Sequence, residues 1–209
     1  MHRLLVEQDE DVLVSTYVER EARYHGMRLT ADEYFALEDD GCRYELIDGV
    51  VCMTPSPLRK HGLVVSEIAY QLCNFAKEQA IGEVAQDMDV LLGKGPRGGD
   101  LIYRPDIAFF KAGRVPDDAE RYKLVPDLVV EVASVSTRRF DRETKKADYE
   151  RLGVSEYWII DPLRRTMHFF RLKEGRYVEV QPEVDRFASS AIPGFVLDLT
   201  ELRKTFKGT

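Results

Sequence analysis

Cysteine is scarce in this sequence, with Cys42, Cys52 and Cys73 the three that occur among 209 residues. Their odd number and the lack of CxxC spacing predict neither a disulfide framework nor a zinc ribbon, and favour reduced thiols. Long apolar runs are also missing. Residues 1–26 contain a short apolar stretch interrupted by acidic residues, which fits neither a signal peptide nor a membrane span. We therefore expect a cytoplasmic protein with no membrane partner.

An excess of positive charge is a further absence. The chain has 30 Lys and Arg against 37 Asp and Glu, a formal net charge of -7. Because Lys and Arg supply most of the affinity of proteins that coat nucleic acid without sequence preference, this balance argues against such a protein. Any contact with DNA must come from a local basic patch. A solvated helix face explains half of the candidates for that patch, which are Arg138, Arg139, Arg142, Lys145, Lys146 and Arg151.

The length and composition indicate one globular domain. Hydrophobic residues make up 44% of the chain and charged residues 32%, far from the profile of a disordered protein. The one clear shift in composition is near Gly26, where a charged segment gives way to patterned sequence. We therefore divide the chain into an N-terminal extension, residues 1–26, and a domain, residues 27–209.

The first half of the domain carries local signals for a helix, a hairpin and a longer helix. Thr30 and Glu33 have the spacing of a capping box, which predicts a short helix to about Leu37. Asp48-Gly49 tolerates the positive φ angles of a tight turn, so residues 44–47 and 50–53 should form a hairpin. Apolar residues recur at helical spacing over residues 62–79, and they alternate with polar ones over residues 84–92, as in a half-buried strand followed by a loop at 93–99.

The second half of the domain predicts a sheet with a crossover helix. A helix is expected over residues 141–152, stopped by Gly153. Four apolar runs look like central strands, at residues 107–110, 128–132, 157–160 and 167–172. The order of hairpins and one strand-helix-strand unit predicts an α/β (α+β) fold, in which helices flank a mixed β-sheet with a β-hairpin toward its N-terminus.

Glu131 is the most unusual residue of the sequence, because it lies within the apolar run Leu-Val-Val-Glu-Val. Burying an ionised carboxylate costs several kcal/mol unless a cation or strong donors meet it. Asp106 begins another apolar run, and if the two strands are neighbours the two carboxylates converge at one end of the sheet. Two carboxylates with water suit a small hard cation such as magnesium. The alternative is a pair of structural acids bonded to Arg104 or to a helix N-terminus.

Helical geometry selects a lysine to accompany these acids. Lys145, Tyr149 and Leu152 share one face of the helix predicted over residues 141–152, whereas Lys146 aligns with a polar face. We therefore place Lys145 toward the sheet, where its ammonium could orient water and offset charge in a transition state. An ordinary exposed lysine is the alternative.

Several other polar residues have simpler explanations. His61 could bind a phosphate or assist a metal, but a plain position near a helix N-terminus is the simpler interpretation. Asp87 and Asp89 share the predicted solvated face of one strand, so we leave them out of the site. Tyr157 and Trp158 are expected to be core or interface residues.

An ordered set of short motifs resembles a known family. The motifs are Tyr44-Glu45-Leu46-Ile47-Asp48-Gly49, Pro105-Asp106, Pro126-Asp127-Leu-Val-Val-Glu131-Val and Gly153-Val-x-Glu-Tyr157-Trp158-Ile-Ile-Asp161-Pro162. Together they are similar to the Uma-type endonucleases, which belong to the PD-(D/E)XK, or restriction endonuclease-like, superfamily. The resemblance covers roughly residues 27–202.

The resemblance implies a restriction endonuclease-like fold and DNA cleavage that depends on Mg²⁺, with Mn²⁺ as a substitute. It assigns the metal to Asp106 and Glu131, the cation to Lys145, and the acid of the first motif to Glu45, which on its own could be a solvated strand residue. One departure is Ala133, which occupies the usual position of the lysine two residues after the glutamate. In this branch the lysine has moved to the following helix. Val135 also departs, since relatives often have proline there.

Three hypotheses follow. The first is a metal-dependent endonuclease that acts on DNA as a homodimer, because a two-fold axis suits cleavage of both strands. The second is an inactive relative that serves as a DNA-binding or protein-interaction module. An amine within hydrogen-bond reach of Glu131 would favour the enzyme. The third, a hydrolase of small phosphate esters, would need an enclosed pocket.

Overall fold

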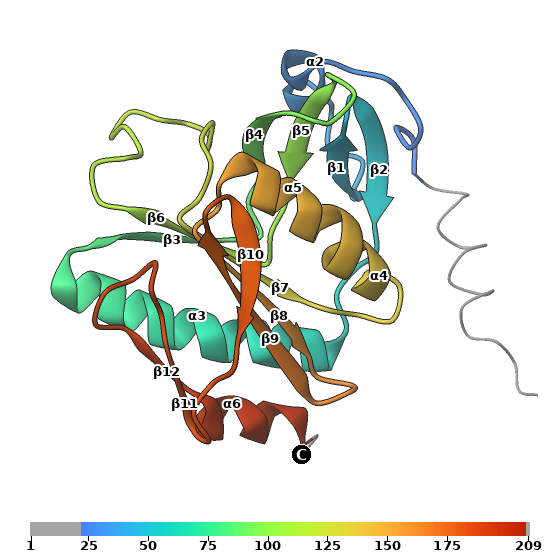
Figure 1. Ribbon diagram of the computed structural model, residues 1–209. Helices are drawn as coiled ribbons and strands as arrows, with labels where there is room; N and C mark the ends of the chain where they lie inside the picture. Colours follow the sequence, from blue (N-terminus) through green and yellow to red (C-terminus); the bar gives the residue numbers. More distant parts are fainter. Residues whose placement is uncertain (1–21, 208–209) are drawn as a thin grey trace, which may run out of the picture.

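Two β-sheets organise the protein in the computed structural model, which describes residues 22–207 (Figure 1). The larger sheet has the strand order β10-β9-β8-β7-β6-β3, and within it β7 and β8 pair in parallel while the other neighbours pair antiparallel. Its strands are β3 (Gly82–Gln86), β6 (Ile107–Lys111), β7 (Leu128–Val132), β8 (Glu156–Asp161), β9 (Thr166–Lys173) and β10 (Arg176–Val180).

The smaller sheet has four antiparallel strands in the order β2-β1-β5-β4. They are β1 (Arg43–Ile47), β2 (Val50–Thr54), β4 (Val90–Lys94) and β5 (Asp100–Tyr103). Helix α2 (Ala31–Phe35) packs beside this sheet. A separate pair of short strands, β11 (Arg186–Ala188) and β12 (Val196–Asp198), precedes helix α6 (Leu199–Phe206).

Helices cover both faces of the larger sheet. On one face lies α3 (Arg59–Gln79), whose Val64 and Ile68 join a core cluster with Val130 of β7. On the other face a continuous helical segment comprises α4 (Arg138–Phe140), the π-helical turn η1 (Asp141–Lys145) and α5 (Lys146–Leu152). Tyr149 of this segment packs in a second cluster with Val129 of β7. The alternation of side chains along β7 therefore supplies both cores, and Glu131 shares the face of Val129.

Most of the predicted elements are confirmed, and with them the α/β (α+β) fold class. Thr30 and Glu33 form the predicted capping box at the start of α2. Asp48 and Gly49 have φ angles of 53° and 80° in the hairpin turn between β1 and β2. The four central strands are β6, β7, β8 and β9, and Gly153 ends α5 in a left-handed conformation with φ 87°.

The prediction of one strand over residues 84–92 is wrong. Strand β3 ends at Gln86 and β4 begins at Val90, and the two strands belong to different sheets. Asp87 has φ 53°, which an extended strand cannot adopt. Asp87 and Asp89 therefore do not share a strand face: Asp87 pairs with Arg43, and Asp89 accepts a hydrogen bond from Arg104.

The loop after β4 is held by a side chain of the first hairpin. Asp48 accepts hydrogen bonds from the backbone N–H groups of Arg97 and Gly99, at 2.9 and 2.8 Å. A Cβ atom on Gly99 would lie 2.2 Å from the carbonyl oxygen of Asp48, so this approach requires glycine. These hydrogen bonds join the turn between β1 and β2 to the loop between β4 and β5.

Residues 1–21 of the predicted N-terminal extension lie outside the described residues. Tyr24 is buried and packs edge to face against Tyr44 of β1, with ring centroids 5.7 Å apart. Gly26 donates a backbone hydrogen bond to Val51 of β2. The boundary at residue 26 stays a prediction. Over residues 22–207, no helix combines the length and apolar character needed to cross a membrane.

Candidate active site

Glu131 lies in β7 with 4% of its surface exposed, in the centre of the apolar strand. Its Oε1 atom accepts a hydrogen bond from the Lys145 ammonium at 2.9 Å and another from the Tyr149 hydroxyl at 3.0 Å. A cation and a strong donor therefore meet the buried carboxylate, as its apolar setting requires.

Lys145 ends the π-helical turn η1 and points toward the sheet, with 5% of its surface exposed. Its Nζ atom lies 2.9 Å from Glu131 and also 2.9 Å from Glu45. Burial would lower the pKa of Lys145, but the charges of Glu131 and Glu45 outweigh it and raise that pKa well above its ordinary value. Its surroundings therefore favour the ammonium form. Lys146 points elsewhere, with its Nζ atom 4.3 Å from the ring centroid of Phe170, so the predicted choice between the two lysines agrees with the geometry.

Asp106 lies directly before β6 and near Glu131. Strands β6 and β7 pair with Ile107 opposite Val130, so Asp106, which precedes Ile107, and Glu131, which follows Val130, lie at the same end of the strand pair. The charge of Asp106 contributes to raising the pKa of Glu131, so the two carboxylates are close enough to interact. The Oδ2 atom of Asp106 accepts the backbone N–H of Val132 at 2.7 Å and lies 3.1 Å from Nε2 of His61.

Glu45 reaches the same place from the smaller sheet. It lies in β1 with 2% of its surface exposed, and its Oε1 atom accepts the backbone N–H of Arg104 at 2.9 Å in addition to contacting Lys145. A solvated strand acid would have neither partner. Lys145 thus joins an acid of each sheet, and all four residues predicted for the site meet where the sheets adjoin.

Comparisons with known proteins show the family to which the chain belongs. The model of the Uma2 family, whose description is "Putative restriction endonuclease", matches residues 31–200. The chain belongs to the Uma2 family. It is also similar to a solved structure described as "a putative nuclease belonging to DUF820 from Anabaena variabilis ATCC 29413", with a TM-score of 0.72, 22% sequence identity, and coverage of 85% of this chain and 99% of that chain. No curated protein matches the chain.

The Uma2 site holds more buried negative charge than Lys145 can neutralise. Glu131 and Asp141 each interact with the charges of Glu45, Asp106 and Lys145, and Asp141 is 2% exposed. Burial raises the pKa of Glu131 well above its ordinary value; Lys145 opposes that rise, while Asp106 and Asp141 add to it. Burial likewise raises the pKa of Asp141 to about 6, against the opposing charge of Lys145. A bound cation would relieve this excess.

The donor atoms of the site fit a hard cation that keeps part of its water. Both hydrogen bonds to Glu131 end at Oε1, and both polar contacts to Asp106 end at Oδ2. The second oxygen of each carboxylate is left for another partner. Within residues 22–207 no three His, Cys, Asp or Glu side chains are grouped as a metal cage. Two carboxylate oxygens supplemented by water suit Mg²⁺ better than Zn²⁺, which prefers three or four nitrogen or sulfur ligands.

A second Pro-Asp pair of the Uma2 chain has a different role. Asp127 follows Pro126 as Asp106 follows Pro105, but its carboxylate accepts the Lys111 backbone N–H at 3.0 Å and the Arg114 guanidinium at 2.5 Å. These contacts tie the start of β7 to the end of β6. Asp127 therefore stabilises the strand pair and does not contribute to the site.

The basic cluster predicted around the site is largely neutralised. The side chain of Arg139 is 87% exposed, and it pairs with Glu143 on the next helical turn. The other members have partners as well: Arg138 with Asp161, Arg142 with His168, Lys145 with Glu45 and Glu131, Lys146 with the Phe170 ring, and Arg151 with Asp148. Lys60, next to His61 on α3, forms no ion pair with the residues that the structure describes.

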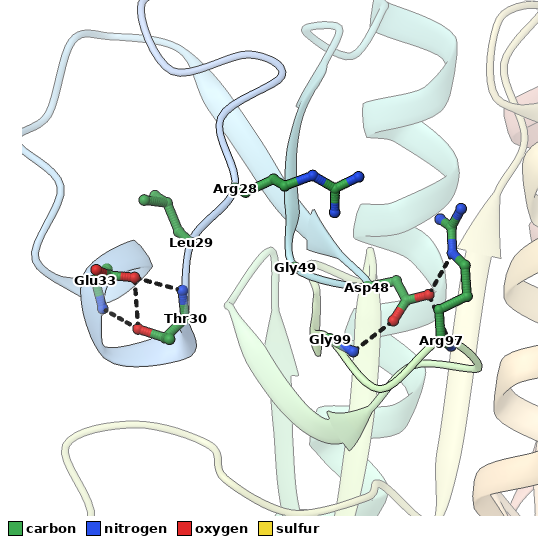
Figure 2. A pocket seen from close by; sticks show the side chains of 8 residues that line it. All are labelled: Arg28, Leu29, Thr30, Glu33, Asp48, Gly49, Arg97 and Gly99. Atoms are coloured by element: carbon green, nitrogen blue, oxygen red, sulfur yellow. Dashed lines mark hydrogen bonds and ion pairs between the residues drawn. The ribbon is translucent and has the colours of Figure 1, made fainter.

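One cavity of the described residues lies away from these acids. Its volume is about 370 Å³, and Figure 2 shows around it Arg28 and Thr30, from the segment before α2, with Asp48 and Arg97 from the turns of the two hairpins of the smaller sheet. None of the site's carboxylates lines this cavity. Both carboxylate oxygens of Asp48 accept hydrogen bonds, from Arg97 and from Gly99, so we assign Asp48 a structural role.

Tyr149 and Asp141 interact with the site without having been assigned a role from the sequence, and His61 contacts it although a plain helix position was its simpler interpretation. Tyr149 binds Glu131, and its signal was the spacing of four from Lys145 on one helix face. Asp141 lies four residues before Lys145 on the same segment, but an acid at the start of a helix is ordinarily a capping or solvated residue. His61 contacts Asp106 from α3, whose body covers the opposite face of the sheet; local sequence holds no signal for such a contact.

Proposed function

We propose that this protein is a Mg²⁺-dependent endonuclease of the PD-(D/E)XK type that hydrolyses phosphodiester bonds in DNA. The observation that carries the proposal is the Lys145 ammonium, held 2.9 Å from both Glu45 and Glu131, with Asp106 at the same end of the strand pair as Glu131. Membership of the Uma2 family supports a nuclease. An amine within reach of Glu131 favours an enzyme over an inactive module, whose carboxylates would merely hold structure.

Asp106 and Glu131 would hold Mg²⁺, or Mn²⁺ in its place, through the carboxylate oxygens to which residues 22–207 donate no hydrogen bond. Glu45 would support the ion directly or through water. A divalent cation supplies charge neutralisation at the phosphate and lowers the pKa of water. The excess of buried negative charge among the four carboxylates favours such an ion over an unliganded site.

Lys145 would orient the attacking water and stabilise the charge that develops on the phosphate. Two of its three N–H donors point to Glu45 and Glu131, which leaves the third for a water molecule or a phosphate oxygen. Because its pKa is raised, Lys145 acts as a fixed cation and not as a base. Water attacks phosphorus in line, the bond to the 3′ oxygen breaks, and that oxygen leaves as the 3′ hydroxyl.

DNA is a more suitable substrate than a small phosphate ester. A small ester needs an enclosed pocket that contains the catalytic groups. The cavity near Asp48 is lined by none of Glu45, Asp106 and Glu131. Lys60 and the exposed Arg139 would supply phosphate contacts that position the duplex. Cleavage of both strands would use a homodimer with a two-fold axis.

The proposal is tested by nicking of supercoiled plasmid during titration with MgCl₂ or MnCl₂. Wild type should nick with either metal and be silent in EDTA. Asp106→Ala and Lys145→Ala should both lose nicking while their circular dichroism spectra match that of wild type. Equal activity in all three proteins would point to a contaminant or another site, and silence of wild type with both metals would favour the inactive module.

A further inference from the structure

Three tyrosines pack together beneath the helical segment that carries Lys145. Tyr103, Tyr149 and Tyr157 are each fully buried, at 0% exposure. The ring centroids of Tyr103 and Tyr149 are 5.6 Å apart, and those of Tyr149 and Tyr157 are 5.0 Å apart. Their rings fill one continuous part of the core, so ring packing alone does not distinguish them.

Their hydroxyl groups have different partners. Tyr103 donates to Asp148 at 2.7 Å, and Tyr157 donates to the backbone carbonyl of Asp141 at 3.0 Å. Tyr149 donates to Oε1 of Glu131 at 3.0 Å, the same atom that accepts the Lys145 ammonium. Tyr149 is therefore the member of this cluster whose hydroxyl touches a carboxylate of the proposed metal site.

We propose that Tyr149 is a positioning residue, whose hydroxyl fixes the Glu131 carboxylate so that Oε2 is presented to the cation. The inference rests on the proposed function and adds a residue that acts through Glu131. With two donors on Oε1, rotation of the carboxylate would break both hydrogen bonds at once. Lys145 alone could not impose this orientation, because its ammonium is also drawn toward Glu45 at the same distance, 2.9 Å.

The chemistry of the hydroxyl suits this role. The Tyr149 side chain is fully buried, and its hydroxyl faces an acceptor oxygen at 3.0 Å, so the hydroxyl acts there as a donor. Lys145 and Tyr149 lie four residues apart in the continuous helical segment and thus project toward the same carboxylate oxygen. Groups that orient a metal ligand in this way commonly control metal affinity by about 10- to 100-fold.

Substitution of single hydroxyls tests the inference, because Tyr→Phe keeps the ring and its packing. Tyr149→Phe is compared with Tyr103→Phe, which loses an equally buried hydroxyl that also binds a carboxylate, that of Asp148. Isothermal titration calorimetry with MnCl₂ measures metal binding without DNA or turnover. Tyr149→Phe should bind Mn²⁺ about 10-fold more weakly than wild type, and Tyr103→Phe should stay within about twofold. Equal binding by wild type and Tyr149→Phe, or equal weakening in both variants, would overturn the inference.

A crystal structure of each metal-free variant separates this inference from the proposed function. If wild type binds no Mn²⁺, the metal-dependent mechanism fails, and the position of the Glu131 carboxylate still decides the role of Tyr149. Rotation of that carboxylate away from Lys145 in Tyr149→Phe, but not in Tyr103→Phe, would support positioning. An unmoved carboxylate in Tyr149→Phe would refute it.

Discussion

The carboxylate of Asp106 accepts a hydrogen bond of 2.7 Å from the backbone N–H of Val132. Val132 follows Glu131 on β7, so the backbone of one acid's strand orients the other acid. This contact requires an acceptor oxygen but not a full negative charge. The position of Asp106 and its charge can therefore be separated by experiment.

Asp106→Asn should abolish nicking, by at least about 100-fold, while its melting temperature stays within a few degrees of wild type. The amide oxygen still accepts the Val132 N–H, but a neutral amide is a poor ligand for Mg²⁺. Asp127→Asn is the matched control, because Asp127 also follows a proline but binds Arg114. It should lower stability by about 1–3 kcal/mol and leave specific activity unchanged. Plasmid nicking and thermal unfolding measure both effects, and full activity of Asp106→Asn would contradict the metal assignment.

Lys145→Met should abolish nicking, whereas Lys146→Met should retain activity within about twofold of wild type. Removing Lys145 leaves Glu45 and Glu131 buried without a cation, which should lower the free energy of unfolding by about 3–5 kcal/mol at pH 7.5. The loss should be smaller at pH 5, because the raised pKa of Glu131 allows that carboxyl to accept a proton. Lys146→Met loses a cation-π contact with Phe170, worth about 0.5–1 kcal/mol.

Urea unfolding in EDTA at the two pH values measures these changes. Similar activity of the two lysine variants would mean that the choice of Lys145 is wrong.

His61→Ala should weaken Mn²⁺ binding by about 10-fold, because the histidine orients Asp106 through its Nε2 atom. His61→Gln should restore most of the affinity, since the glutamine amide can donate from nearly the same position. The Nδ1 atom of His61 is buried and has no hydrogen-bond partner among the described residues, so its loss leaves no donor or acceptor stranded. Calorimetric titration with MnCl₂ compares the three proteins. An alanine variant that binds as tightly as wild type would exclude a role for this contact.

Asp141→Asn should stabilise the metal-free protein at pH 7.5 and have little effect at pH 4. The pKa of Asp141 is raised from 3.8 to about 6 in the folded protein, so the folded state holds its proton more tightly than the unfolded state. The stability that this proton provides is fully present below pH 3.8 and is lost as the pH rises to about 6. Above that, the buried charge costs up to about 3 kcal/mol, the equivalent of the shift.

Urea unfolding from pH 4 to 8 in EDTA shows the difference between wild type and Asp141→Asn. A gain from the substitution that did not grow over this range would show that Asp141 is not the group responsible.

Local sequence was enough to select the individual candidate residues, but it could not predict that they lie close together in the fold. The apolar neighbours of Glu131 alone marked it as unusual, and the helix face predicted that Lys145 points toward the sheet, where it contacts Glu45 and Glu131. That Asp106 lies near Glu131 depends on β6 pairing with β7, which periodicity does not specify. Glu45 comes from the other sheet, and its burial depends on contacts with Lys145 and Arg104 that only the fold creates.

The interruption of β3 and β4 shows where alternation misleads. Val84, Met88, Val90 and Leu92 fit a period of two, although Asp87 turns the chain out of one sheet and toward the other. A positive φ angle at aspartate carries no unique sequence signal, since aspartate also occurs in strands and helices. The π-helical turn that ends at Lys145 could not be predicted either, because it contains no proline or glycine.

Strands β3 and β6 are neighbours in the larger sheet, yet the chain between them leaves that sheet, forms β4 and β5, and then returns. The smaller sheet is thus an excursion added to a simple hairpin, joined by the earlier strands β1 and β2. A miniature in which a tight turn replaced residues 87–106, and from which the first hairpin was also removed, would keep every strand of the larger sheet while discarding Glu45 and Asp106. Glu131 and Lys145 would remain with the larger sheet, so the proposed site draws its residues from both parts of the chain.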